Sequence, residues 1–379
     1  MKFKAEKNRL SEAIINASKA CAVKTIFNAL DGVLLNLEGD VLTVTGYDLE
    51  IGIRIKIKVE GLEDGEIVVD ARLFGDMIRR MPSDCPIEIS VYNEKDVSIN
   101  AGKVKLNING VSSSNFPNII ELNESVNFKL KEAVVKNMLY QISHAIAQND
   151  INPALMGARF DIEDGILYVV ASDGMRLALR KEKINYNNIS FILPEKTVTE
   201  LIRNLSDSYE EENFVTVIID HNQICFLKEN YIIFSRLLDG KFIDYNRIIN
   251  FQPNREVKVN CRDMIYSLER SLLLITEKYK SPVICSLSAE GGEIMKISCK
   301  TNLGSFEENI DVKHSVLNEF ASHSKEFSIA FNPRFMIDAL KSSGCDEVKI
   351  SIMSELSPIK ISSVSEGDFV FIVVPVRLK

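Results

Sequence analysis

Ser172 and Asp173 are adjacent, and a serine beside a carboxylate is the first place in this chain to look for nucleophilic catalysis. A nucleophilic serine needs a general base, usually histidine. The four histidines, His144, His221, His314 and His323, form no motif with this serine. No two of them lie four residues apart, so they do not have the spacing of a zinc site either. An enzyme is therefore the weaker hypothesis.

Other chemical motifs are missing from the sequence. It contains neither a Walker A loop nor a G-x-G-x-x-G fingerprint. Acidic runs such as Glu210–Glu212 and Glu307–Glu308 are typical of solvated loops or faces. Seven cysteines, an odd number with no C-x-x-C spacing, argue against a disulfide framework or a zinc knuckle. We expect scattered buried thiols and no metal site.

Composition places the chain among globular proteins. It has 379 residues, 46% hydrophobic and 26% charged, enough for two to three domains. No stretch approaches the roughly 20 apolar residues that span a membrane. The segment 1–7 lacks the apolar core of a signal peptide. We expect a cytoplasmic protein with no membrane partner.

The net charge of −8 limits how the chain could bind nucleic acid. Affinity for DNA comes mainly from Lys and Arg side chains that neutralise phosphates. A DNA-binding role would therefore require positive charge gathered on one face, or a way of holding DNA that does not depend on affinity.

The elements that would position any site repeat three times. Each copy opens with a strand and an amphipathic helix, expected at 9–20, 131–145 and 262–274. The apolar stripe of the first helix has i, i+3, i+4, i+7 spacing. The second stripe lies 125 residues after the first, and the third lies 129 residues after the second. The three stripes are Leu10, Ala13, Ile14, Ala17; Val135, Met138, Leu139, Ile142; and Met264, Ser267, Leu268, Ser271.

A second helix recurs in each copy, expected at 72–81, 195–205 and 333–342, between strands of alternating pattern such as 41–45 and 166–170. The first two copies also close alike, at 116–120 and 242–249. We predict an α+β fold of three tandem domains, at 1–122, 123–250 and 251–379. Repetition alone also fits a duplicated scaffold that binds only proteins.

Three segments carry a family resemblance. The segment 171–178, ASDGMRLA, resembles a signature of the bacterial β sliding clamp, the processivity subunit of DNA polymerase III. The segment 235–245 resembles a second signature, and the ending 374–378, VPVRL, is similar to the family's C-terminal tail. The resemblance spans the whole chain in order.

The resemblance implies a head-to-tail homodimeric ring of six domains, with inner helices and outer antiparallel sheets. Such a ring encircles double-stranded DNA without sequence preference and tethers the replicative polymerase. The clamp loader and other proteins with clamp-binding motifs are further expected partners. The resemblance implies no catalysis and no cofactor.

The segment 103–109 alternates polar and apolar side chains, as an edge strand that must be paired or covered. By resemblance, Leu106 and Ile108 would meet Leu273 and Leu274 of the other subunit. Packing of this strand within its own domain is an equally open alternative.

Weak positive potential inside a ring would suffice to hold DNA and still permit sliding. The candidate DNA-binding residues on inner helices and loops are Lys24, Arg72, Arg79, Arg80, Lys136, Asn149, Lys196, Arg203 and Lys341. Of the basic ones, Lys24, Arg72 and Lys196 match basic positions of the family. Pro153 and Ala154 replace two tyrosines that contact DNA in one family member, which puts contact through that loop in doubt.

The family's partners dock a short apolar peptide in a groove between the second and third domains. The resemblance nominates Leu155, Ser172, Gly174, Met175, Arg176, Leu177, Ile243, Arg247, Ile248, Tyr279, Asn332, Phe335, Leu356, Pro358, Val373, Val374, Pro375, Val376 and Arg377. Aliphatic members would hold the anchors, and Arg176 and Arg247 would meet carbonyls or carboxylates. Met175 stands where histidine is common and Ile243 where proline is common, so peptide preference can differ.

Overall fold

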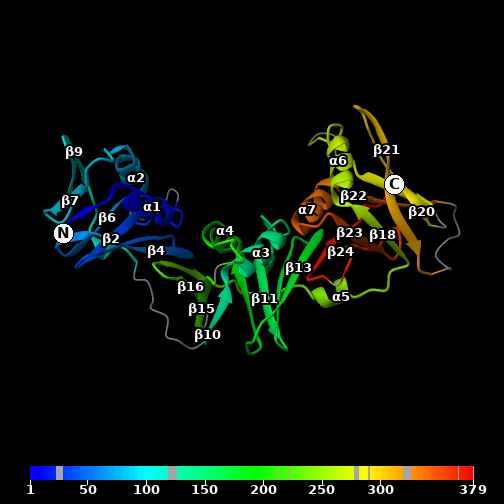
Figure 1. Ribbon diagram of the computed structural model, residues 1–379, viewed down its shortest axis with the longest axis horizontal. Helices are drawn as coiled ribbons and strands as arrows, with labels where there is room; N and C mark the ends of the chain where they lie inside the picture. The colour runs from blue at the N-terminus through cyan, green and yellow to red at the C-terminus, as the bar shows by residue number, and fades with distance from the viewer. Residues whose placement is uncertain are drawn as a thin grey trace. The chain divides into compact units, whose positions relative to one another are not determined.

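The computed structural model describes residues 1–22, 29–117, 126–210, 212–220, 222–276, 281–288, 291–318, 326–365 and 367–378. The chain forms two compact units (Figure 1). Met1–Glu132 and Ser208–Leu237 make the first, and Ala133–Asp207 and Leu238–Lys379 make the second. Within the described ranges, no helix is both long and apolar enough to cross a membrane.

The described residues of the first unit form two α-helices, one short 3-10 helix and two sheets. Its elements are β1 (Lys2–Ala5), α1 (Lys7–Ser18), β2 (Gly32–Glu38), β3 (Val41–Tyr47), β4 (Ile51–Lys58), β5 (Glu60–Glu63), β6 (Gly65–Asp70), α2 (Ala71–Arg80), β7 (Ile87–Tyr92), β8 (Asp96–Ala101), β9 (Val104–Asn109), η1 (Ser113–Asn115), β10 (Val126–Lys131), β15 (Phe214–Asp220), β16 (Gln223–Lys228) and β17 (Tyr231–Arg236). The sheet orders are β5-β1-β7-β8-β9 and β10-β15-β16-β17-β4-β3-β2-β6.

The second unit is built on one twelve-stranded sheet. Its elements are α3 (Glu132–Ser143), η2 (Pro153–Met156), β11 (Gly157–Glu163), β12 (Ile166–Ser172), β13 (Arg176–Lys183), β14 (Ile189–Pro194), α4 (Glu195–Asn204), α5 (Tyr245–Ile249), β18 (Arg255–Asn260), α6 (Cys261–Ser271), β19 (Val283–Ser288), β20 (Gly292–Thr301), β21 (Gly304–Val316), β22 (Glu326–Phe331), α7 (Pro333–Ser343), β23 (Glu347–Ile352), β24 (Ile359–Ser363) and β25 (Phe369–Val373). The order is β14-β11-β12-β13-β25-β24-β23-β18-β21-β20-β19-β22.

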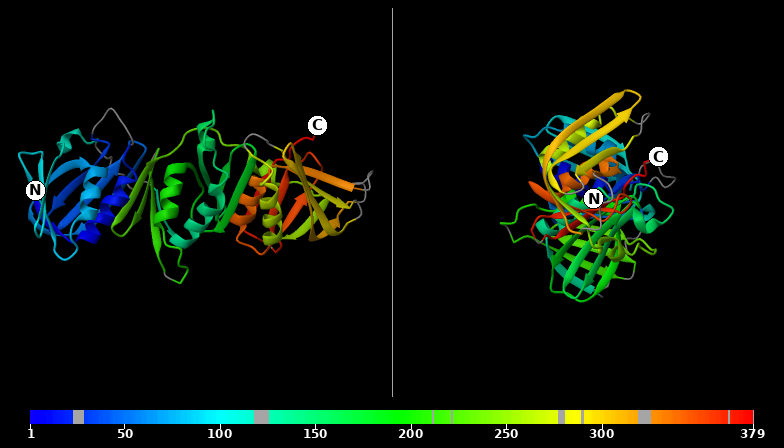
Figure 2. Two further views of the ribbon diagram at one scale, coloured as in Figure 1. Left: turned by 90° about the horizontal axis from the view of Figure 1, so that it is seen from above. Right: turned by 90° about the vertical axis from the view of Figure 1, so that its right-hand side faces the viewer.

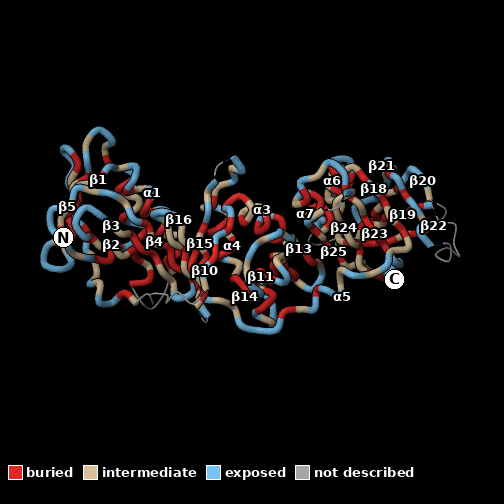
Figure 3. The backbone as a smooth tube through the Cα atoms, turned by 60° about the horizontal axis from the view of Figure 1, so that its bottom comes forward, coloured by how far each residue is buried: buried red, intermediate tan, exposed pale blue. Residues whose placement is uncertain are grey.

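The apolar stripes predicted for the first helix of each copy are buried throughout, including Ser267 and Ser271 of the weakest copy. Ser271 satisfies its hydroxyl by donating to the Leu268 carbonyl at 2.6 Å, which lets a polar residue occupy a core position. Helix α6 ends at Ser271, so Leu273 and Leu274 lie in the turn after it rather than on the predicted helix. Figure 3 shows buried strand interiors between exposed turns.

Capping residues set the ends of the second helices. The Asp70 carboxylate accepts from the Leu73 N–H at 2.6 Å at the start of α2. Asn332 accepts from the Arg334 N–H at 3.0 Å, and Pro333 opens α7 as predicted. Gly344, with φ +65°, ends the same helix in the left-handed region.

The strand orders contain the predicted three-fold repeat. One quartet recurs as β1-β7-β8-β9, β10-β15-β16-β17 and β18-β23-β24-β25. The other recurs as β6-β2-β3-β4, β14-β11-β12-β13 and β22-β19-β20-β21. Three tandem α+β modules are therefore confirmed, each with two helices of ten or more residues and two four-stranded antiparallel sheets among the described residues. Figure 2 shows the longest hairpin of the series, β20 and β21.

Successive modules join by the same pair of edge strands. In the first unit, β17 of the middle module pairs antiparallel with β4, from Tyr231↔Ile55 to Ser235↔Ile51. In the second unit, β25 of the third module pairs with β13, from Arg176↔Val373 to Arg180↔Phe369. The strands β4 and β13 hold the same place in their modules, and so do β17 and β25. Both junctions therefore follow one rule: the last strand of the β6-β2-β3-β4 type of sheet pairs with the last strand of the β10-β15-β16-β17 type in the next module.

Two strands that are equivalent to these junction strands join no other module among the described residues: β9 of the first module corresponds to β17 and β25, and β21 of the third module corresponds to β4 and β13. Within the described part of the chain, β9 pairs only with β8. The residues 304–311 of β21 pair only with β20, whereas 312–316 also pair with β18. Both edges therefore keep backbone groups on one side that no described strand covers.

Candidate peptide-binding groove and DNA-facing residues

The turn between β12 and β13 is fixed by two side chains. The Asp173 carboxylate accepts from the N–H groups of Met175 and Arg176, each at 2.9 Å. The Ser172 hydroxyl donates to the Arg176 carbonyl at 2.7 Å and accepts from the Gly174 N–H at 3.2 Å. Gly174 has φ +80°, which glycine adopts without strain. The Ser172–Asp173 pair thus shapes a turn and leaves Met175 exposed at its tip.

Arg176 leaves this turn on β13 and is held from three sides. Its guanidinium donates to Asp173 at 2.9 Å and to Asp338 of α7 at 2.6 Å. It also lies over the Phe335 ring, 4.6 Å from the centroid. Only 15% of the side chain is exposed. Arg176 therefore ties the middle module to α7, which leaves Arg247, 88% exposed, as the better placed of the two predicted arginines to meet a ligand.

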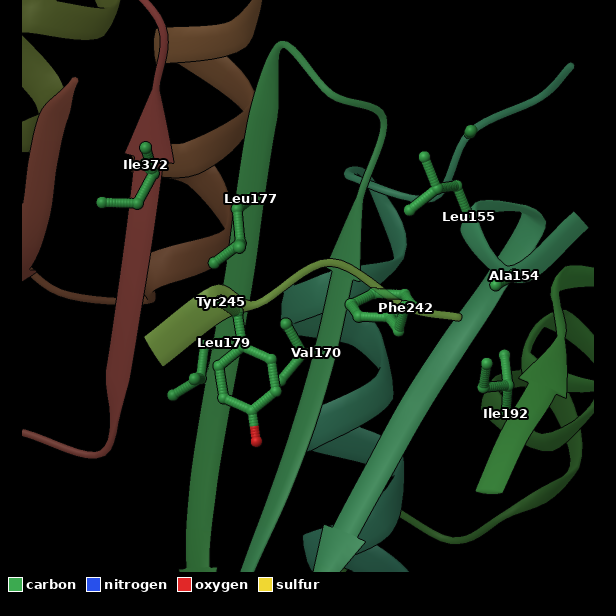
Figure 4. Packing of buried hydrophobic residues seen from close by; sticks show 10 residues of the cluster. Ala154, Leu155, Val170, Leu177, Leu179, Ile192, Phe242, Tyr245 and Ile372 are labelled. Atoms are coloured by element: carbon green, nitrogen blue, oxygen red, sulfur yellow. The ribbon is translucent and has the colours of Figure 1, made fainter. Parts of the chain in front are cut away.

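An apolar cluster lies beside the turn (Figure 4). Leu177 of β13 stands opposite Ile372 of β25, and Leu155 belongs to the same cluster. Ile243 and Ile248 pack on it and stay half-buried. The structure thus brings together five aliphatic residues from η2, β13, β25 and the α5 segment, and four of the five were among the predicted groove residues.

Strand phase separates Val373 from this cluster. Val373 is the cross-strand partner of Arg176, whereas Ile372 is the partner of Leu177. Neighbours along a strand point to opposite faces, so buried Val373 lies on the other face from Leu177. Ile372 was missed from the sequence, although period-two alternation on β25 would have paired it with Leu177. Phe242 and Tyr245 also belong to the cluster and were missed.

A pocket of about 550 Å³ opens beside the cluster. It is lined by Arg159, Gly240, Lys241, Phe242, Ile243, Asp244 and Tyr245. The Tyr245 hydroxyl donates to buried Asp161 at 3.0 Å, and Arg159 donates to the same carboxylate at 2.8 Å. Burial and the neighbouring carboxylate raise the pKa of Tyr245. The phenol therefore stays protonated and anchors the α5 segment.

The C-terminal tail is docked after β25. The Val374 N–H donates to the Met175 carbonyl at 2.9 Å, and the Val376 N–H donates to the Ala330 carbonyl at 2.7 Å. Val374, Pro375 and Val376 are half-buried, and Arg377 is exposed. Val376 also lines a pocket of about 380 Å³ with Asn332, Arg334, Ile275, Thr276, Ser281 and Pro282. The tail thus connects the turn at Met175 to the start of α7.

Two further predicted groove residues lie in the β23–β24 turn. Leu356 is 59% exposed and Pro358 is half-buried. Among the described residues, Leu356 and Pro358 are not members of the apolar cluster, so their part in the groove stays a prediction. Tyr279 lies outside the described residues.

His144 lies where the middle module meets α7. Its Nδ1 is 3.2 Å from the Ser342 hydroxyl, and its ring meets Phe371 edge-on at 5.5 Å. Burial and the Arg176 guanidinium lower the pKa of His144 to about 4. A neutral imidazole therefore occupies this contact at neutral pH.

Most of the predicted DNA-facing cations are exposed but paired. Arg79 and Arg80 share Asp76, and Lys136 lies 3.5 Å from Asp207. Arg203 pairs with Glu200 at 2.6 Å, and Lys341 pairs with Glu269 at 2.7 Å. Arg72, Asn149 and Lys196 are exposed, and Lys24 lies outside the described residues. The part of these residues in DNA contact stays a prediction.

The four predicted interface residues divide by exposure. Leu273 is 78% exposed and Leu274 is half-buried. On β9, Leu106 is half-buried and Ile108 is buried, while Lys105 and Lys103, which precedes the strand, are exposed. A single exposed leucine is common on protein surfaces, so the part of Leu273 in a subunit contact stays a prediction.

No group of three His, Cys, Asp or Glu side chains in the described ranges is placed to hold a metal ion. The seven cysteines are free thiols, five of them buried.

Three tandem modules of one α+β fold, joined edge to edge by equivalent strands, define the class of a three-domain clamp subunit. The chain belongs to the DNA polymerase III beta subunit family. Residues 1–120 match the model of its N-terminal domain, 129–244 that of the central domain and 246–377 that of the C-terminal domain.

Relatives agree over their full length. The chain is 30% identical to the beta sliding clamp of Bacillus subtilis and 26% identical to that of Escherichia coli K12, with each chain covered completely. Among solved structures, a putative DNA polymerase III beta subunit from Eubacterium rectale superposes with a TM-score of 0.92 at 27% identity. A DnaN sliding clamp from Pseudomonas aeruginosa bound to griselimycin gives 0.90 at 26%, both with full coverage of each chain.

Proposed function

We propose that this chain is a DNA sliding clamp. Two subunits close into a ring around duplex DNA, and the ring confers processivity on DNA polymerase III by tethering it. The function is not catalytic. The modules would run from 1–122, 123–250 and 251–379, near the ranges that the family models match.

The observation that carries the proposal is the repeated junction. The strand pairs β4·β17 and β13·β25 join the modules, and the equivalent strands β21 and β9 keep open edges among the described residues. Applying the same rule once more pairs β21 of one subunit with β9 of the next. An interface between unlike surfaces closes if the rotation permits, and two three-module chains give six modules.

Charge complementarity supports this pairing. The β9 hairpin presents exposed Lys103 and Lys105, and the open part of β21 presents exposed Glu307, whose carboxylate also pairs with Lys296 at 2.8 Å. Opposite charges across paired strands favour the contact and disfavour pairing of β9 with another β9. Leu273 beside β21 would add apolar area to the same interface.

Topology would then replace affinity. A closed ring retains DNA although the net charge is −8, because the duplex cannot leave without opening the ring. The exposed cations on the helices, Arg72 and Lys196 among them, would supply weak contacts to phosphates.

Partners would bind at the second junction. The half-buried Ile243, Ile248 and Val374 offer aliphatic contact, and exposed Met175 can adapt its shape to several ligands. The replicative polymerase, the clamp loader and other proteins with a short apolar motif would compete there. Free cysteines fit the reducing cytoplasm where such a complex would work.

Retention on circular DNA tests the function. The protein is loaded by an ATP-driven clamp loader onto nicked circular DNA and isolated by gel filtration. A clamp co-elutes with the circle and is released when one cut linearises it. Equal retention on both forms indicates ordinary binding, and none on either form indicates a scaffold that binds only proteins. Both results would contradict the proposal.

A further inference from the structure

We infer that Phe234, lying over Gly52 and against Tyr47, closes the first module junction, so that only the second junction of each subunit accepts a partner peptide. This inference rests on the groove proposed above and identifies what restricts binding to it. The first junction, where β4 pairs with β17, lies within the first unit, and the second junction, where β13 pairs with β25, lies within the second.

The two junctions have the same backbone. Asp48 accepts from the N–H groups of Glu50 at 3.0 Å and Ile51 at 2.8 Å, as Asp173 accepts from Met175 and Arg176. Leu49 has φ +77°, and Gly174 has φ +80°.

The ends of β17 and β25 make equivalent hydrogen bonds to the neighbouring module. The Arg236 N–H donates to the Glu50 carbonyl at 2.8 Å, and the Val374 N–H donates to the Met175 carbonyl at 2.9 Å. A shift of 125 residues on β4 therefore relates equivalent positions, and Phe234 stands where Ile372 stands.

The apolar floor is also shared. Buried Leu30 and Phe116 of the first module correspond to Leu155 and Phe242 of the second. Phe116 forms a cluster with Val68, on which Tyr47 packs. The first junction thus retains the base on which a peptide anchor could rest.

The side chains above that floor differ. Tyr47 stands in place of Ser172, and the pair Gly52↔Phe234 stands in place of Leu177↔Ile372. The rings of Tyr47 and Phe234 lie 5.4 Å apart at 50°. Two aromatic rings of the chain itself therefore occupy the place where the second junction has a serine and an isoleucine.

Gly52 makes the ring position possible. A Cβ at this residue would lie 1.8 Å from the Phe234 ring, so no other side chain fits beneath it. Burial raises the pKa of Tyr47, which agrees with a phenol covered by its neighbours. The Phe234 ring thus occupies the space that a side chain at position 52 would take, and it covers the first junction.

Hydrogen exchange on the wild-type protein tests the inference without any substitution. Griselimycin, found bound to the Pseudomonas aeruginosa clamp, serves as the probe. We expect it to slow exchange at 172–177 and 372–376 and to leave 47–52 and 232–236 unchanged. Protection at 47–52 would overturn the inference. No protection anywhere would contradict the proposed groove, and the inference with it.

The variant Phe234→Ala tests the same claim by stoichiometry. Ile233→Ala is the matched control, since buried Ile233 neighbours Phe234 on β17 and points to the opposite face. Isothermal titration should give one griselimycin per subunit for the wild type and the control. It should give two for Phe234→Ala, the added one at least about tenfold weaker because Leu177 has no counterpart there. A folded Phe234→Ala that still binds one would contradict the inference, and if it does not fold the exchange experiment decides.

Discussion

Arg176 of β13 and Asp338 of α7 are joined by a hydrogen bond of 2.6 Å, across 162 residues of sequence. The bond links the turn that presents Met175 to α7, whose first residue, Pro333, lies three residues after the Ala330 carbonyl that the tail contacts. It gives Arg176 a bracing role at the proposed groove, where the family resemblance implied direct contact with ligand.

We therefore expect Asp338→Ala to lower the free energy of unfolding by about 1–2 kcal/mol, since a charge-assisted bond is lost and Asp338 is partly exposed. It should also weaken peptide binding, because α7 and the tail lose their tie to the turn. Chemical denaturation and isothermal titration measure both effects. Asp368→Ala is the matched control: it removes an exposed partner of Arg180 on the same strand pair, 3.0 Å away, and should cost less than about 1 kcal/mol. Equal effects of the two variants would show that the brace is unimportant.

His144 gives the junction a predictable pH dependence. Its pKa is lowered to about 4 from 6.5, so the unfolded chain takes up the proton first. The free energy of unfolding should fall as pH drops from about 6.5 to about 4, by about 2 kcal/mol at pH 4.5, with no contribution above that range. Denaturation curves of the wild type and His144→Gln at pH 7.5 and 4.5 measure this, and the gap between the two proteins should change by that amount. A gap independent of pH would contradict a neutral imidazole at this half-buried position.

The docked tail predicts a separation of binding from assembly. Deleting 374–379 removes the hydrogen bonds of Val374 and Val376 but leaves β25 intact, because that strand ends at Val373. Polymerase binding in a pull-down should be lost, and the mass in solution should stay the same. Deleting only 378–379 is the control and should preserve binding. Full binding by the longer deletion would remove the tail from the site.

Charge on α2 should affect retention on DNA. Arg79→Glu with Arg80→Glu reverses two exposed cations beside Asp76, and the half-life on nicked circular DNA should fall about three- to tenfold. Lys129→Glu with Lys131→Glu on β10 makes the same charge change on exposed strand positions and should have little effect. If both pairs behave alike, net charge rather than position governs retention.

Local pattern was enough to predict much of the fold. The stripe of Leu10, Ala13, Ile14 and Ala17 is buried as its spacing predicted, and the same phase holds in the other two copies. Pro333 and Gly344 mark the ends of α7 because their backbone preferences act within a few residues.

Partner choice across long separations could not be predicted in the same way. Alternation indicates that β4 and β17 are strands, but it does not say that they pair with each other. The strand register decides that Ile372, and not the predicted Val373, lies opposite Leu177 in the apolar cluster. The packing of α7 decides that Arg176 donates to Asp338. Neither leaves a local signal in the sequence.

The central claim is that β21 of one chain pairs with β9 of another to close a ring. Leu273→Asp with Leu274→Asp should break this contact, whereas Leu62→Asp, at a half-exposed position of β5, should not. Sedimentation equilibrium and negative-stain electron microscopy of the three proteins measure mass and shape together. The wild type and Leu62→Asp should form particles of twice the 42.6 kDa chain mass with a central hole, and the double variant should form single chains without one. Wild-type particles that are single chains with no hole, or a double variant that remains a ring, would contradict the account.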